Sequence, residues 1–159
     1  KILERLKKYN FLEDIYVSKI IPSSININLS KTEIVGKTVI NSEIFYIGKN
    51  GKLINSNYIE EFKNIPTIFG DFNTKEYLYL LKILNDQELE TQNIEKLYFY
   101  KNKRWDLLFS NNKTLMLPSN KIEESINIYK KLLKNGNLIN TKVIDLRVKN
   151  QIILTNSNE

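Results

Sequence analysis

The sequence predicts an α+β fold with mainly antiparallel sheets and few helices. Three observations support this class. Short segments that alternate apolar and polar residues outnumber segments with helical spacing. Turn signals such as Asn50-Gly51 lie directly between such segments. No regular alternation of strands and helices indicates a parallel, Rossmann-type sheet.

The first thirty residues predict a helix, a strand, a turn and a second strand. Residues 1–9 have apolar side chains at helical spacing, and residues 15–19 are rich in strand-forming types. Pro22 begins a turn, and residues 24–29 alternate Ile or Leu with Asn or Ser, so we expect one face of that strand to be buried. A two-stranded ribbon of this size needs further partners for stability.

The next stretch predicts a hairpin followed by a connector. Residues 38–40, 43–47 and 52–54 are strand-like, and Asn50-Gly51 supplies the tight turn because both residues tolerate positive φ. Residues 65–70, which contain Pro and Gly, predict a turn-rich connection.

Two helices are predicted in the remainder of the chain, each with a capping-box signal at its start. Asn73 with Glu76 begins the first, and Asn120 with Glu123 begins the second. Gly136 follows a basic last turn, as is typical of a helix C-terminus.

The predicted strands of this part of the chain are 96–100, 105–109, 114–117, 142–147 and 151–155. The last of these is apolar and no further strand follows it. An apolar edge strand can accept a strand from a partner. Pairing within the chain, with the apolar side toward the core, explains the pattern equally well, so the sequence leaves both interpretations open.

Composition excludes several classes of protein. The 159 residues contain 42% hydrophobic residues, with a mean hydropathy of -0.36, and no apolar run approaches the length of a membrane span. Cys and His are absent, which removes thiolate nucleophiles, the commonest general base and the usual transition-metal ligands. No signal peptide is visible and the first residue is Lys, so we expect a fragment of a longer protein, and we expect no enzyme.

A net charge of +6 raises the possibility of a nucleic-acid partner. Among the 24 basic residues only Arg5, Arg104 and Arg147 are arginines, the type preferred for bidentate phosphate and guanine contacts. We therefore interpret the charge as a solvated surface. A basic nucleic-acid-binding domain stays as the alternative.

Six short motifs occur in a fixed order. They are VSKIIPSSININLSK at 17–31, FYIGKNGKL at 45–53, IPTIFG at 65–70, RWDL at 104–107, LMLP at 115–118 and IDLR at 144–147. In this order they resemble the extracytoplasmic part of the bacterial FtsQ/DivIB family, in the form seen in alphaproteobacteria. Lys19, Lys31 and Gly48 stand where the family pattern has Arg, Glu and Asp.

The resemblance implies a fold and a role. Residues 1–35 would be the C-terminal part of a POTRA domain, and residues 36–159 an FtsQ-type β-domain with two helices. The protein would be a non-catalytic divisome scaffold that links early and late division proteins for septal peptidoglycan synthesis. A missing N-terminal span would anchor it at the periplasmic face of the inner membrane. No cofactor, small-molecule substrate or nucleic acid is expected.

The resemblance also implies partners and a site. FtsB-like and FtsL-like proteins would be the partners, and an FtsB-like strand would add to the last strand of the β-domain. By position the edge would be lined by Arg147, Val148, Lys149, Asn150, Gln151 and Ile152, with Lys103 or Arg104 as the charged contact. A POTRA module of an outer-membrane transport or assembly protein is a further alternative, although no tandem repeat is visible.

Overall fold

A computed structural model describes residues 2–156, and the chain packs as two compact units, an N-terminal unit (1–62) and a C-terminal unit (63–159). Each unit is described by itself. Residue 1, where the first predicted helix begins, and residues 157–159 lie outside the described part.

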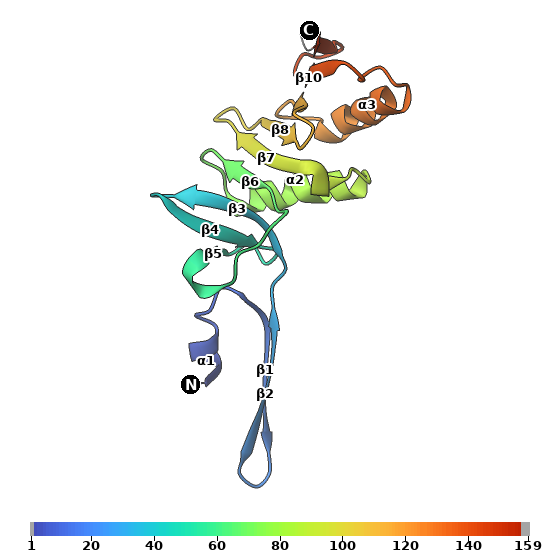
Figure 1. Ribbon diagram of the computed structural model, residues 1–159. Helices are drawn as coiled ribbons and strands as arrows, with labels where there is room; N and C mark the ends of the chain where they lie inside the picture. Colours follow the sequence, from blue (N-terminus) through green and yellow to red (C-terminus); the bar gives the residue numbers. More distant parts are fainter. Residues whose placement is uncertain (1, 157–159) are drawn as a thin grey trace. The chain divides into compact units, whose positions relative to one another are not determined.

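The elements confirm the predicted α+β class (Figure 1). The helices are α1 (Ile2–Leu6), α2 (Thr74–Asp86) and α3 (Ile122–Lys134), with short 3-10 helices η1 (Ser56–Tyr58) and η2 (Thr91–Asn93). The N-terminal unit contains the strands β1 (Leu12–Ile20), β2 (Ser24–Lys31), β3 (Ile34–Ile40), β4 (Glu43–Gly48) and β5 (Leu53–Asn55). The C-terminal unit contains β6 (Thr67–Phe69), β7 (Ile94–Phe99), β8 (Trp105–Phe109), β9 (Thr114–Met116), β10 (Thr141–Asp145) and β11 (Ile153–Asn156). No helix among residues 2–156 has the length and apolar character that crossing a bilayer requires.

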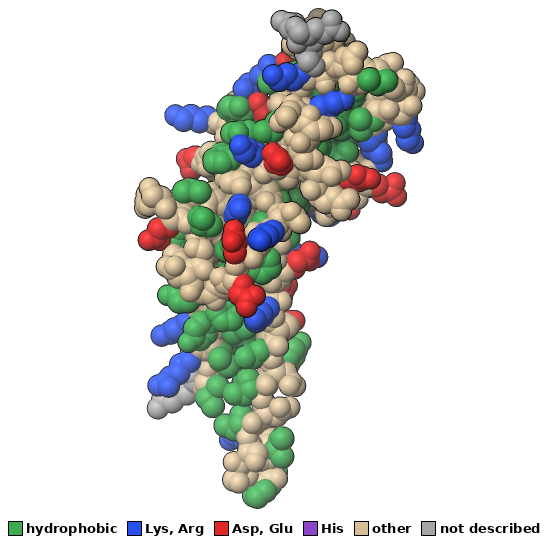
Figure 2. All heavy atoms as spheres, viewed as in Figure 1, with side chains coloured by type: hydrophobic (Ala, Val, Ile, Leu, Met, Phe, Trp, Pro, Cys, Tyr) green, Lys and Arg blue, Asp and Glu red, His purple; other side chains and the backbone are tan. Residues whose placement is uncertain are grey.

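The β1–β2 ribbon differs from the prediction that one face of residues 24–29 is buried. The two strands pair antiparallel, with Val17 opposite Ile27 and Ile15 opposite Leu29, so their apolar side chains share one face. Every residue of β2 is nevertheless exposed, and Figure 2 shows hydrophobic side chains on the surface of the ribbon. The prediction is wrong for the described chain, because Leu12 is the only buried residue of the two strands.

The strands β3, β4 and β5 form an antiparallel meander, which confirms the predicted hairpin. Gly51 has a φ of 78°, and its N–H donates to the Gly48 carbonyl at 2.9 Å, as a tight turn requires. The domain boundary expected at residues 35/36 falls inside β3 and stays a prediction.

The C-terminal unit contains two parallel crossovers that the sequence did not predict. β6 pairs in parallel with β7 across α2, and β9 pairs in parallel with β10 across α3. The pairs β7–β8, β8–β9 and β10–β11 are antiparallel. Residues 65–70 therefore include a strand rather than only a connector, and a strand of three residues is too short for its periodicity to reveal it.

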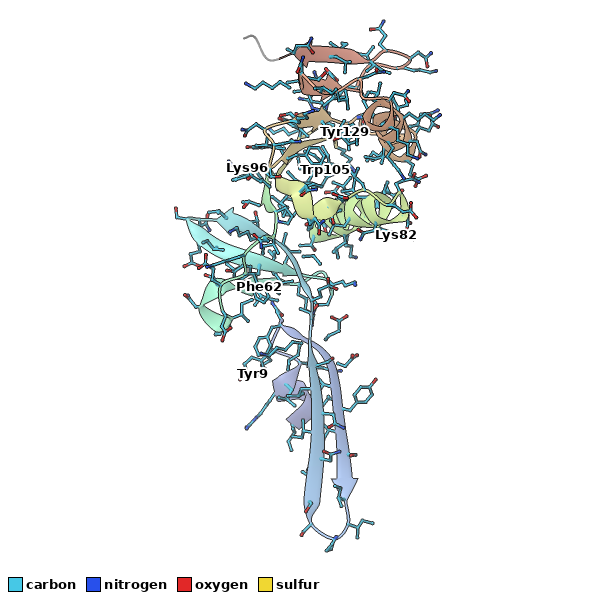
Figure 3. All side chains as sticks on the ribbon, turned by 45° about the vertical axis from the view of Figure 1, so that its right-hand side comes forward. Tyr9, Phe62, Lys82, Lys96, Trp105 and Tyr129 are labelled. Carbon is cyan, nitrogen blue, oxygen red and sulfur yellow. The ribbon has the colours of Figure 1, made fainter. Side chains whose placement is uncertain are left out.

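Both long helices cover the same face of these strands (Figures 1 and 3). One row of side chains on that face is fully buried, and its members are strand neighbours: Ile68, Leu97, Leu107, Leu115 and Ile144. Figure 3 shows Trp105 and Tyr129 on the helix side and Lys96 on the opposite side. The face without helices carries the alternate residues of the same strands, and it contains the charged groups described below.

The starts of the two helices differ. Asn73 caps α2, and its capping box with Glu76 is complete, as predicted. The predicted cap of α3 is wrong, because Lys121 precedes the helix with a φ of 55° and no side chain caps it. Asn120 is therefore one residue too early to cap. The basic last turn of α3 is confirmed, and Gly136 lies just beyond the helix with a φ of 69°.

Candidate interaction site at the edge strand

The strand β11 forms an edge of the sheet. It pairs with β10 on one side, with Leu154 opposite Ile144 and Ile153 opposite Asp145, and no described strand pairs with its other side. All four of its residues are exposed, including Ile153 at 46% and Leu154 at 39%. Of the two interpretations that the sequence left open, burial against the core is wrong: β11 pairs within the chain through β10, but its apolar side chains are exposed, and binding of a partner strand stays a prediction. The outer backbone groups of β11 are available to another strand.

The six residues expected to line this edge lie in the loop that precedes it. Residues 146–152 connect β10 to β11, and the loop contains a turn in which the Gln151 N–H donates to the Val148 carbonyl at 3.1 Å. The predicted strands 142–147 and 151–155 are therefore shifted: β10 ends at Asp145 and β11 begins at Ile153. The Asp145 carboxylate accepts the Arg147 N–H at 3.0 Å, so that N–H is not available to a strand ladder.

A groove of about 580 Å³ separates this loop from the start of α3. The loop 146–152 forms one wall, and Pro118 with the first turns of α3 forms the other. The apolar side chains in it are partly exposed: Val148 at 44%, Ile152 at 45% and Ile128 at 38%. The lining of the groove ends at Ile152, the residue that precedes β11.

Four charged side chains meet on the sheet face that carries no helix. Asp106 and Asp145 lie on β8 and β10, and both are in register with Met116 on the intervening strand β9. Arg147 follows Asp145 and returns to it, donating from Nε at 2.8 Å and from Nη2 at 2.6 Å. Arg104 precedes β8, and its guanidinium stacks 4.2 Å from the Tyr100 ring. We call Arg104, Asp106, Asp145 and Arg147 the charge cluster.

The cluster shifts the pKa values of its two carboxyl groups in opposite directions. The hydrogen bonds from Arg147 hold the pKa of Asp145 below its usual value, with a further contribution from the charge of Arg104. Burial raises the pKa of Asp106 above its usual value, despite a hydrogen bond from Tyr100 and the positive charges of Arg104 and Arg147. Burial and Asp106 also raise the pKa of Tyr100. The positive charge of each arginine thus attracts both carboxylates, so the cluster connects β8 with β10 electrostatically.

Of the four charged residues predicted for the site, the structure brings Arg104 and Arg147 together in the charge cluster, whereas Lys149 lines the loop groove and Lys103 lies elsewhere. Lys103 lies in the β7–β8 turn, and its Nζ is 3.9 Å from Glu76 of α2. The Lys103 side chain is 76% exposed and the distance is long, so this ion pair contributes little to stability.

Sequence reasoning missed the two aspartates and Tyr100. A signal for the aspartates was present: Arg104 and Asp106 are two residues apart, as are Asp145 and Arg147, and residues at this spacing share one face of a strand. The sequence did not reveal that β8 and β10 flank the same strand. Among residues 2–156 no three His, Cys, Asp or Glu side chains group as metal ligands would.

Comparison with known proteins agrees with the motif order. The family model "Cell division protein FtsQ/DivIB, C-terminal" matches residues 39–147. The cell division protein FtsQ of Rickettsia bellii is 30% identical over 156 residues, and that of Rickettsia conorii is 28% identical over 154 residues. Both alignments cover 95% of this chain and 57% of the relative, so the chain spans little more than half the length of these proteins.

A solved structure is also similar in part. The major extracytoplasmic domain of the cell division protein DivIB from Geobacillus stearothermophilus aligns with a TM-score of 0.44 and 10% sequence identity. The alignment covers 65% of this chain and 92% of that domain.

The family match places this chain in the class of bacterial cell division proteins, since it covers more than half of the residues. The chain belongs to the FtsQ/DivIB family. The predicted resemblance is confirmed, and a role in cell division follows from it.

Proposed function

We propose that this chain is a non-catalytic scaffold of the bacterial divisome, whose edge strand β11 binds a partner by strand addition. One observation carries the proposal: β11 is exposed along all four residues and has an unpaired side among the described strands. Strand addition obtains its affinity from main-chain hydrogen bonds and its specificity from side-chain pockets beside the strand. The loop groove beside β11 is such a pocket.

The partners are FtsB-like and FtsL-like division proteins, and the complex links early and late division proteins for septal peptidoglycan synthesis. Membership of the FtsQ/DivIB family supports this assignment. In the longer protein, residues 1–35 complete a POTRA domain and residues 36–159 are the β-domain. An N-terminal membrane span holds both at the periplasmic face of the inner membrane, at the division septum.

The proposed site comprises the edge and its surroundings. It contains Lys103, Arg104, Arg147, Val148, Lys149, Asn150, Gln151 and Ile152, and we add β11 itself. Val148 and Ile152 present apolar surface to the groove. The loop residues act as the side-chain part of the site, and β11 acts as its backbone part.

The expected affinity is modest. A strand paired along β11 gains roughly 1 kcal/mol for each hydrogen bond, and one apolar anchor adds about 2 kcal/mol. Association costs several kcal/mol in lost freedom, so a dissociation constant near the micromolar range follows. Anchoring both proteins in one membrane strengthens the interaction in the cell.

A proline scan of β11 tests the proposal. Neighbouring residues of an antiparallel strand direct their N–H groups to opposite sides, so only one of Ile153 and Leu154 donates toward the free edge. Proline at that residue removes one bond to the partner and leaves the β10 ladder intact. Proline at the other residue removes a bond within the hairpin.

The measurement is a titration of the 159-residue chain with a peptide from the periplasmic end of the FtsB-like protein of the same organism. We expect the proline variant at whichever of Ile153 and Leu154 donates toward the free edge to weaken binding about fivefold or more while its thermal unfolding stays native. Ile153→Ala and Leu154→Ala control for the lost side chains. Native affinity in both proline variants would refute strand addition at β11, and salt-sensitive binding to duplex DNA in a parallel titration would favour the nucleic-acid alternative.

A further inference from the structure

We infer that Arg147, supported by Arg104, is a positioning residue of the β11 site rather than its charged contact: with Asp145 and Asp106 it clamps the loop that leads into the edge strand. This inference rests on the proposed function, and it changes the role of two of the residues assigned to the site.

The contacts of Arg147 carry the first step. Its backbone N–H and its Nε both donate to Oδ1 of Asp145, at 3.0 and 2.8 Å, and its Nη2 donates to Oδ2 at 2.6 Å. A guanidinium bound through two nitrogens to one carboxylate is held in a single orientation. Asp145 is itself only 9% exposed. The side chain of Arg147 is therefore directed back onto its own sheet, and its charge is already compensated.

The second half of the cluster extends this arrangement across β9. Asp106 is 4% exposed. It pairs in register with Met116 of β9 on one side, and Asp145 pairs in register with the same Met116 on the other side. The positive charge of Arg104 acts on both aspartates, and that of Arg147 does so as well. The buried Nε of Arg104 and Oδ1 of Asp106 have no hydrogen-bond partner among the described residues. Both atoms are therefore out of contact with solvent.

The clamp acts on the segment that determines where β11 begins. Leu146 continues the contact with β9, since its N–H donates to the Met116 carbonyl at 3.0 Å. Arg147 then fixes the next peptide through its N–H, and the turn at residues 148–151 follows at once. Because β11 starts two residues after this turn, its register with β10 depends on how the chain leaves Asp145.

Lys149 differs from Arg147 because it is exposed and is not paired with a described carboxylate. It is exposed in the loop, lines the groove, and has no ion-pair or hydrogen-bond partner among residues 2–156. A partner carboxylate can approach it without breaking an internal pair. If the site makes a charged contact, Lys149 is the cation that is free to make it.

Conservative substitutions distinguish a clamp from a charged contact. Arg147→Lys keeps the positive charge but loses the bidentate geometry, whereas Arg147→Gln loses both. We expect both variants, and Asp145→Asn, to weaken binding of the FtsB-like peptide by about tenfold. We expect the salt dependence of binding to stay native in all three. Lys149→Gln weakens binding only about two- to fivefold, and it flattens the salt dependence.

The matched control is Arg5→Lys, an exposed arginine of α1 in the other unit, which leaves affinity native. Hydrogen exchange of the free chain supplies a second readout. The amides of Arg147 and Gln151 should exchange about tenfold faster in Arg147→Lys and in Asp145→Asn than in the native chain.

The outcomes separate the inference from the proposed function. Native affinity in Arg147→Lys, with loss in Arg147→Gln, would mean that the charge alone matters and would overturn the clamp while leaving strand addition intact. Unchanged exchange at Arg147 and Gln151 in Asp145→Asn would also overturn it. Failure of the native chain to bind the peptide would refute the proposed function, and with it the role of the clamp in binding.

Discussion

On the sheet face without helices, the surroundings of two aspartates shift their pKa values in opposite directions. Asp145 and Asp106 are both buried carboxylates beside arginines. Asp145 receives three hydrogen bonds from Arg147, and its pKa lies below the ordinary value. For Asp106 the cost of burial exceeds the attraction of the nearby positive charges, and its pKa is raised. The first carboxylate therefore stabilises the fold when it is ionised, and the second does so when it is protonated.

The difference predicts opposite dependences on pH. The contribution of Asp145 is present above its unfolded pKa of about 3.9 and is lost as the pH falls through its lower folded value. We expect Asp145→Asn to lower the free energy of unfolding by about 1–3 kcal/mol at pH 7, and by less at pH 3. Ionised Asp106 costs stability at pH 7, and this cost falls as the pH drops through its raised pKa.

Asp106→Asn is therefore nearly neutral or stabilising at pH 7. Urea unfolding of the native chain and both variants at pH 7 and pH 3 measures these differences. An equal loss of stability for the two variants at pH 7 would contradict the assigned environments.

Among the elements, α2 and α3 show that a capping signal in the sequence is realised only when the chain enters the helix at the matching residue. Asn73 accepts from the Lys75 N–H at 2.9 Å, and Glu76 accepts from the Asn73 N–H at 3.0 Å. At α3 the corresponding Asn120 makes no such bond, because the left-handed conformation of Lys121 places the helix start one residue later. The two asparagines are matched in type and differ in role.

Alanine substitution of each asparagine tests this difference. We expect Asn73→Ala to reduce the free energy of unfolding by about 1 kcal/mol, because an N-terminal N–H of α2 loses its acceptor. Asn120→Ala is expected to change it by less than about 0.5 kcal/mol, as is typical of surface positions. Chemical denaturation of both variants gives the comparison. A cost at Asn120 as large as at Asn73 would show that α3 is capped as the sequence predicted.

At the scale of the whole molecule, the two units contain different amounts of core. The buried apolar residues of the N-terminal unit are Leu12, Tyr46, Ile47 and Ile54, and the larger number of buried apolar residues belongs to the C-terminal unit. The β1–β2 ribbon contributes only Leu12 to this core, and its apolar face is exposed. An exposed apolar face of this extent is expected to pack against a further element. Its exposure agrees with the proposal that residues 1–35 complete a POTRA domain in the longer protein.

The ribbon gives a prediction that compares this chain with the longer protein. Ile27 is 41% exposed, so Ile27→Thr should cost less than about 1 kcal/mol of stability in this chain. In the longer protein we expect a cost of about 1–3 kcal/mol, because the same face would be covered. Thermal or urea unfolding of both proteins tests it, with Leu107→Ala as a control that should cost about 2–5 kcal/mol in each. An equally small cost in both proteins would argue against the POTRA assignment.

Local features of this protein could be predicted from its sequence. The Asn50-Gly51 turn, the cap at Asn73 and the helix end at Gly136 were predicted because each depends on the conformational preferences or hydrogen bonds of neighbouring residues. The α+β class followed from the periodicity of the segments, and the family followed from the order of its motifs. The edge strand was identified as one of two interpretations.

The tertiary structure alone decided the features that depend on which strands become neighbours. The short strand β6 and the two parallel crossovers exist because their backbone groups pair with distant strands. The charge cluster exists because β8 and β10 flank β9 in a register that sets Asp106 and Asp145 beside Met116. β10 ends at Asp145, whose carboxylate binds Arg147, so residues 146–152 form a loop before the edge strand rather than the strand itself. Pairing and register join residues far apart in sequence, and no local pattern specifies them.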